Sequence, residues 1–321
     1  MEFINRAMQR AAILAAVLWA APPALSTACR ADTLDAFAAP PSPLAMGPLL
    51  YTAKNWSGYA AETDFAAPAS DTVTAVTGAW IVPAVSPPSN PAANVSGQMS
   101  DCAVWVGIDG FSDSTVEQVG TLSYVESGFK YYYAWYEMYP NAMVPINSFT
   151  IRPGDSMTAS VVYGLPGYAN EFQLSIADNT TGKSDTVYET SSPTAERTSA
   201  EWIVEAPTSG TSILPLPRFG SATFTAATAT IGGTTGPIDD YSSWQVSQIN
   251  MVDKAWDDAM TPAAITDAGS AASSSFTVYQ APEPSALAML AAAAGCLVLC
   301  SAGRMFVAGD KPGMNAGPIT G

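Results

Sequence analysis

The sequence predicts an all-β protein built as an antiparallel two-sheet β-sandwich or jelly roll. Short alternating runs rich in Val, Thr, Tyr and Trp recur from residue 51 to residue 280. Clusters of Gly, Pro, Asn and Asp, such as Pro153–Asp155, separate these runs. No stretch with helical periodicity lies between them. Many short strands without intervening helices are typical of sandwiches and jelly rolls.

The predicted strands follow one another through most of the chain. The alternating runs cover residues 72–82, 103–108, 129–139, 156–163, 170–176, 200–204, 222–231, 244–251 and 275–279. The cluster Gly232–Gly236 is expected to form a turn, because it has no Lys and no helix follows it. We therefore expect one sandwich domain over residues 51–281.

The two ends of the chain differ from this domain. Arg6 and Arg10 precede an apolar run and a stretch of small residues, which predicts a secretory signal over residues 1–28. Residues 29–50 are rich in Ala and Pro and are expected to be a linker or a short pro-segment. Residues 282–305 contain Pro-Glu-Pro, an apolar run and Arg304, and residues 306–321 form a tail.

The segment 282–305 resembles the PEP-CTERM sorting signal of Gram-negative bacteria. That resemblance implies an exported protein, located outside the cell or on the cell surface. It also implies a transient membrane association through the apolar run. As a helix, this run does not quite reach across a hydrocarbon core of about 30 Å.

Charge limits the partners of this protein. The chain of 321 residues has 28 Asp and Glu against 12 Lys and Arg, which gives a net charge of −16. Nucleic-acid binding needs clustered basic residues, so we expect no nucleic-acid partner. A pI near 4.1 suits acidic surroundings, where protonation of carboxylates relieves self-repulsion.

The absence of histidine limits the chemistry. It excludes Ser-His-Asp and Cys-His catalysis and zinc sites built on His. Proton transfer must come from carboxylates, Tyr, Lys or a thiol, and we expect no metal and no cofactor. Of the four cysteines only Cys102 lies in the central region, where we expect it to be a packed core thiol.

Several predicted strands carry polar groups among aromatic residues. In Ser199–Glu205, alternation places Glu201, Ile203 and Glu205 on one face and Trp202 and Val204 on the other. Trp105 and Asp109 share a face in the same way, Glu137 stands in a row of Tyr and Trp side chains, and Trp56 is flanked by polar residues. Gln118 lies on the face opposite to that of its neighbour Glu117. Together they predict a groove for an extended polymer, either a peptide or a glycan.

Five motifs in order resemble those of the glutamic peptidases, the eqolisins of family G1. They are Asn55–Gly58 (NWSG), Ala103–Gly110 (AVWVGIDG), Glu117–Gly120 (EQVG), Ala134–Pro140 (AWYEMYP) and Ala200–Glu205 (AEWIVE). The resemblance extends from about Lys54 to about Asp253. It implies a concanavalin A-like sandwich of two large antiparallel sheets and an endopeptidase acting on polypeptides at acid pH.

The resemblance also implies roles for individual residues. The catalytic Gln–Glu pair of the family falls on Gln118 and Glu205, with the glutamate as general base and acid and the glutamine as oxyanion stabiliser. Positions that line or support the cleft fall on Trp56, Trp105, Asp109 and Glu137. Val119 and Glu117, on either side of the glutamine, depart from the family pattern.

Two other hypotheses stay open at this level. A jelly-roll glycoside hydrolase would use Glu137 and Glu205 as acid and nucleophile, but it would give Gln118 no role. A non-catalytic surface-binding sandwich would need only the aromatic face. In each case we expect a monomer.

Overall fold

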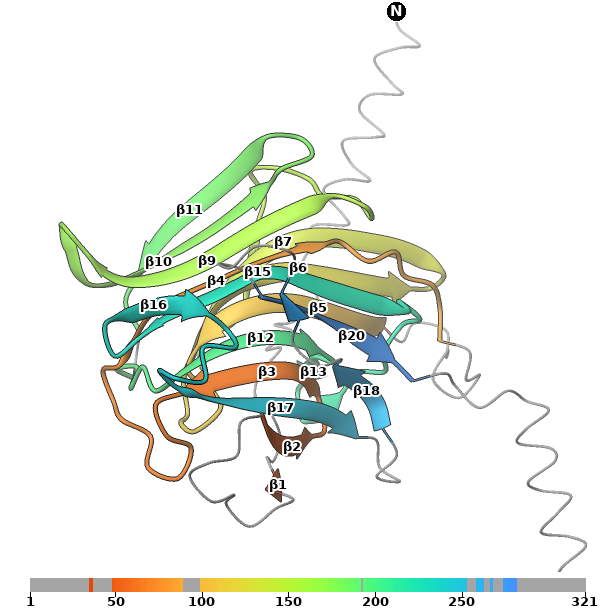
Figure 1. The fold of residues 1–321 in the computed structure, drawn as a ribbon. Coiled ribbons are helices and arrows are strands. Elements are labelled where there is room, and N and C mark those ends of the chain that lie inside the picture. Colours follow the sequence, from red (N-terminus) through yellow and green to blue (C-terminus); the bar gives the residue numbers. More distant parts are fainter. Residues whose placement is uncertain are drawn as a thin grey trace, which may run out of the picture. The chain divides into compact units, whose positions relative to one another are not determined.

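All of the regular secondary structure in the described residues is β-strand. The structure, a computed structural model, describes residues 35–36, 48–88, 99–191, 193–252, 258–262, 266–267 and 274–281. The strands form two layers, here called sheet I and sheet II (Figure 1). A small separate hairpin, β13 (Thr208–Ser209) with β14 (Ser212–Ile213), follows β12.

Sheet I carries the motifs singled out above. Its strands, in spatial order, are β8 (Val144–Ile146), β7 (Phe129–Tyr139), β6 (Val116–Glu126), β5 (Met99–Ile108), β12 (Ser199–Glu205), β3 (Trp56–Glu62), β17 (Gln245–Val252), β2 (Leu49–Ala53) and β1 (Asp35–Ala36). All neighbours are antiparallel except β17 and β2, which are parallel.

Sheet II lies against sheet I. Its strands, in spatial order, are β11 (Lys183–Glu189), β10 (Tyr168–Asp178), β9 (Ser156–Leu165), β4 (Val73–Ile81), β15 (Ser221–Ile231) and β20 (Ser274–Gln280). The short strands β16 (Thr234–Pro237) and β19 (Thr266–Asp267) pair with β15 and β20. β18 (Asp258–Pro262) pairs with the end of β17 in one sheet and with β20 in the other, so it joins the two sheets.

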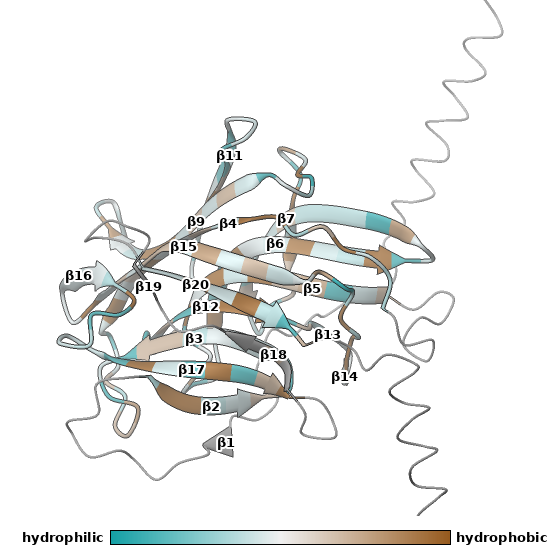
Figure 2. Cartoon of the chain, turned by 45° about the vertical axis from the view of Figure 1, so that its right-hand side comes forward, coloured by the Kyte–Doolittle hydropathy of each residue, from teal (hydrophilic) through white to brown (hydrophobic). Residues whose placement is uncertain are grey.

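The main hydrophobic core lies between the sheets. Hydrophobic and hydrophilic residues succeed one another along strands such as β15 and β17 (Figure 2), as expected when one strand face is buried. Two indoles also join the layers by hydrogen bonds: Trp202 Nε1 donates to the Thr77 carbonyl (2.8 Å) and Trp80 Nε1 to Thr121 Oγ1 (3.0 Å). Gly78 permits this contact, because a Cβ there would lie 2.9 Å from Val106 Cγ1.

The central strands of sheet I are buried on both faces. Every residue of β3 and β12 is buried. A second hydrophobic cluster covers the face turned away from sheet II, and its members include Trp56, Trp105, Trp135, Leu122 and Ile203. Glu201 and Glu205 belong to this face, because they alternate with Trp202 and Val204 of the main core. We call it the site face.

The predicted fold is confirmed, and each of the nine predicted strands is present with ends shifted by a few residues. The structure adds further strands, among them β3 and β6, which flank the β5–β12 pair in sheet I. Cys102 is free and buried, as expected, and burial raises the pKa of its thiol. Gly232 and Gly233 have positive φ and turn the chain from β15 into β16.

The predicted signal segment 1–28 and the segment from 282 onward lie outside the described residues. Of the predicted linker, only residues 35–36 and 48–50 are described. No helix within the described part of the chain is long and apolar enough to span a membrane.

Candidate active site

Glu205, the last residue of β12, is fixed by side-chain donors. It is fully buried, opposite Trp56 of β3 and Ala103 of β5. Trp105 Nε1 donates to its Oε2 (2.8 Å), and Asn55 Nδ2 donates to its Oε1 (3.3 Å). A carboxylate is acceptor-only when ionised, so this pair of N–H donors suits its charged form.

Two tryptophans enclose this carboxylate. The rings of Trp56 and Trp105 meet edge to face, with centroids 5.0 Å apart. The indole N–H groups of Trp56 and Trp135 are buried and have no hydrogen-bond partner among the described residues. The face therefore holds two buried N–H donors for which the described residues supply no acceptor.

Gln118 and Glu137 form a second polar pair on the same face. They lie opposite each other on β6 and β7, and Gln118 Nε2 donates to Glu137 Oε2 (3.0 Å). Both side chains are buried. The pairing register shows that Gln118 is two strands from Glu205 across the sheet and four residues away along it.

Trp105 lies between these two pairs. On β5, Trp105 stands midway between Gly107, which lies opposite Gln118, and Ala103, which lies opposite Glu205. Its indole N–H contacts Glu205. Its six-membered ring extends towards Gly107, next to the Cβ of Gln118. One indole thus connects the carboxylate with the amide, and Gly120 makes room for it: a Cβ there would lie 2.5 Å from Trp105 Cβ.

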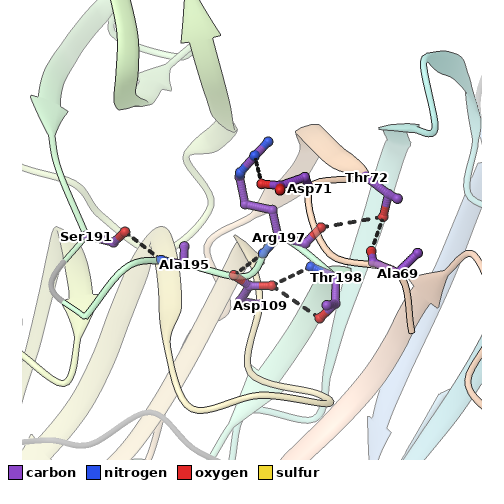
Figure 3. A network of polar contacts seen from close by, with 8 residues as sticks. All are labelled: Ala69, Asp71, Thr72, Asp109, Ser191, Ala195, Arg197 and Thr198. Carbon is purple, nitrogen blue, oxygen red and sulfur yellow. Dashed lines mark hydrogen bonds and ion pairs between the residues drawn. The ribbon is translucent and has the colours of Figure 1, made fainter. Parts of the chain in front are cut away.

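Asp109 lies apart from Glu205, near the opposite end of β12. Its backbone N–H donates to the Ser199 carbonyl, and its own φ is 71°. Its carboxylate accepts hydrogen bonds from the backbone N–H groups of Arg197 (2.6 Å) and Thr198 (2.7 Å), as Figure 3 shows. Asp109 therefore shapes the chain leading into β12, and the structure does not bring it to the Glu205 carboxylate.

Several other carboxyl groups are buried, and no ion pair with a cation is seen for them in the described part of the chain. Burial is the main cause that raises the pKa of Asp109 to about 8, and the hydrogen bond and charge of the nearby Asp113 add to this effect. Burial raises the pKa of Glu62 to about 8 and that of Asp101 to about 7. It also raises the pKa values of Glu117 and Glu201 well above the ordinary range. These groups hold protons that an exposed carboxyl would lose.

The comparison of this chain with known proteins identifies its family. The sequence profile of the Peptidase A4 family matches residues 54–277, most of the chain. The chain belongs to the peptidase A4 family.

A relative in this family is aspergillopepsin-2 from Aspergillus niger, 37% identical over 202 residues, which are 58% of this chain and 67% of the relative. The fold is similar to that of scytalido-glutamic peptidase solved with a transition state analog inhibitor, with a TM-score of 0.55 and 22% identity over 71% of this chain and 98% of the other. It is also similar to SCP-B, an eqolisin solved with the tripeptide Ala-Ile-His, with a TM-score of 0.51 and 22% identity over 70% and 97%.

The predicted membership in the glutamic peptidases is confirmed, and the protein is a glutamic-type peptidase. The individual roles of Gln118 and Glu205 stay predictions. Among the predicted residues, the structure brings Trp56 and Trp105 to Glu205 and brings Glu137 to Gln118. No group of His, Cys, Asp or Glu in the described ranges has a geometry that would hold a metal ion.

Two further residues, Asn55 and Glu201, belong to this region, and the sequence pattern assigns neither of them a role. Asn55 was quoted within a motif, but the contact of its amide with Glu205 spans 150 positions. Glu201 was placed on the correct face without a role. Its signal was present, because it shares the alternation that places Glu205.

Proposed function

We propose that this peptidase hydrolyses internal peptide bonds of polypeptides on the site face, with Glu205 as general base and Gln118 as oxyanion donor. The observation that carries the proposal is the Glu205 carboxylate, buried and held by N–H donors on both oxygens. A general base must be held in one orientation within reach of the water that it deprotonates.

The reaction needs no covalent intermediate. Glu205 takes a proton from a water, and the oxygen of that water attacks the scissile carbonyl carbon. The carbonyl oxygen becomes an oxyanion, to which Gln118 donates an N–H. Glu205 then gives the proton to the leaving amine as the C–N bond breaks. One oxyanion donor is worth about 3–4 kcal/mol in the transition state.

The remaining residues support these two. Trp105 and Asn55 orient Glu205, and Glu137 orients the amide of Gln118. The unpartnered N–H groups of Trp56 and Trp135 suit backbone carbonyls of an extended peptide. Peptide recognition is supported by the similar folds of SCP-B, which was solved with a tripeptide, and of scytalido-glutamic peptidase, which was solved with a transition state analog inhibitor.

The substitution Glu205→Gln tests this function. An amide cannot accept the proton of the water, so we expect kcat on a fluorogenic peptide at acid pH to fall by a factor of about 10² or more, the range of general acid–base catalysis. The matched control is Glu196→Gln, at an exposed glutamate, with full activity expected. A folded Glu205→Gln protein with wild-type kcat would show that the base is another residue.

We further propose that the protein acts after export and as a monomer, with no nucleic-acid partner. The predicted signal over residues 1–28 and the net charge of −16 support this. Mass spectrometry of secreted protein tests it: the N-terminus should lie after residue 28, and the state of the segment from 282 onward shows whether this segment is removed.

A further inference from the structure

Four residues form one row across the site face. Glu201 of β12 lies opposite Gly107 of β5, Gly107 opposite Gln118 of β6, and Gln118 opposite Glu137 of β7. Residues directly opposite each other on neighbouring strands point to the same side of a sheet. The row therefore places a carboxyl group on either side of Gln118.

Gly107 contributes no side chain to this row. A Cβ added at Gly107 would lie 3.2 Å from Gln118 Cβ and 2.9 Å from Trp105 Cζ3. The glycine itself places no side chain between Glu201 and Gln118, and the edge of the Trp105 ring lies beside this position. Two strand spacings of about 4.8 Å set their backbones roughly 10 Å apart. Two long side chains bridge such a distance directly or through one water.

The hydrogen-bonding groups on the two sides of Gly107 complement each other. Gln118 Nε2 donates to Glu137, while Gln118 Oε1 is buried and has no partner among the described residues. Both carboxyl oxygens of Glu201 are likewise buried and unpartnered within the described part of the chain. The amide oxygen needs a donor, and a protonated carboxyl has one O–H to give.

The surroundings of Glu201 keep it protonated. Burial raises its pKa well above the ordinary range, and the charges of Asp109, Asp113 and Glu62 raise it further. The hydroxyl of Ser199, nearby but outside hydrogen-bond geometry, opposes the shift only in part. Glu201 is thus a neutral donor, in contrast to Glu205, whose two oxygens face N–H donors.

We propose that Glu201 is a positioning residue: its carboxyl O–H donates to Gln118 Oε1, directly or through one water, and fixes the orientation of the amide. The side-chain amide of a glutamine can rotate by about 180°, which exchanges the positions of its oxygen and its nitrogen. Held by Glu201 on one side and Glu137 on the other, Gln118 keeps its second N–H directed at the reacting carbonyl. The inference rests on the donor role of Gln118 proposed above.

Three variants of the full chain test this with a fluorogenic peptide substrate. Glu201→Met keeps the length but removes the donor, so we expect kcat to fall by about 10- to 100-fold with KM within about twofold. Glu201→Gln can still donate through its amide and should keep kcat within about threefold of wild type. The matched control is Glu117→Met, which removes a buried carboxyl next to Gln118 in sequence but on the opposite face.

The outcomes separate this inference from the proposed function. Equal kcat in Glu201→Met and Glu117→Met would overturn the positioning role, and if Glu205→Gln is then still inactive, the base assignment stands. An inactive Glu201→Gln beside an active Glu205→Gln would overturn both, because the base would then be Glu201. If Glu201→Met does not fold, Glu201→Asp decides: its shorter carboxyl should lose kcat to a similar extent, and wild-type kcat would overturn the proposal.

Discussion

At the scale of single residues, glycine positions decide what can stand on the site face. Gly107 and Gly120 lie on neighbouring strands beside Trp105, and any side chain there would collide with the indole or with Gln118. These glycines do not serve turns. They leave space for the Trp105 ring and the polar side chains. This explains why glycine occurs within β5 and β6, where a Cβ would otherwise be expected.

We predict that Gly107→Ala lowers kcat more than it lowers stability. The new methyl group would lie 2.9 Å from Trp105 Cζ3 and 3.2 Å from Gln118 Cβ, so it must displace the amide, the indole or both. A displacement of about 1 Å in a catalytic group can cost about 100-fold in rate. Peptide hydrolysis and thermal unfolding measured on the same sample check this. Wild-type kcat in a folded variant would show that the added methyl group displaces neither Gln118 nor Trp105 and would contradict the prediction.

At the scale of elements, the two sheets are joined by hydrogen bonds inside an apolar core. Trp80 of β4 donates to Thr121 of β6, and Trp202 of β12 donates to the backbone of β4. Each bond satisfies the N–H group of a buried indole. They also fix how β12, with Glu205 at its end, lies against sheet II.

We predict that Thr121→Val destabilises the domain by about 1–3 kcal/mol, the cost of leaving the Trp80 N–H buried without an acceptor. Valine has nearly the same shape, so packing changes little. The control is Thr186→Val on β11, where the hydroxyl is exposed and a change near zero is expected. Urea unfolding of both variants gives the measurement, and equal midpoints would contradict the assigned role of this bond.

At the scale of the whole molecule, the described residues hold many buried carboxyls and few cations. The pKa of Glu62 and of Asp109 is raised to about 8 and that of Asp101 to about 7, chiefly by burial. In the unfolded chain the pKa values of the same groups are about 4. Between these values the unfolded state releases protons that the folded state keeps, so unfolding becomes easier as pH rises.

We therefore predict that stability is complete below about pH 4 and falls as pH rises through 7–8, beyond which these groups contribute no further loss. Thermal unfolding at pH 4, 6 and 8 checks this. Self-repulsion from the net charge of −16 also lowers stability as pH rises. The control is therefore Glu62→Gln, which removes one of the buried carboxyls and should make the melting temperature depend less steeply on pH. A melting temperature that is higher at pH 8 than at pH 4 would contradict the prediction.

The sequence by itself determined the β-sandwich, the family, and the face on which each residue of a strand lies. These follow from local information: a period of two along a strand fixes Glu201 and Glu205 opposite Trp202, and the motifs need only order and spacing. The absence of histidine likewise restricted the chemistry without any coordinates.

Only the tertiary structure decided which polar residues meet. Asn55 contacts Glu205 across 150 positions, and Glu201 shares a row with Gln118 because β5 lies between their strands. Asp109 was expected to line or support the cleft, and its carboxylate accepts hydrogen bonds from the backbone that enters β12. Strand order and register depend on contacts between segments far apart in sequence, and one residue of slip would move every side chain to the other face. No local pattern holds that information.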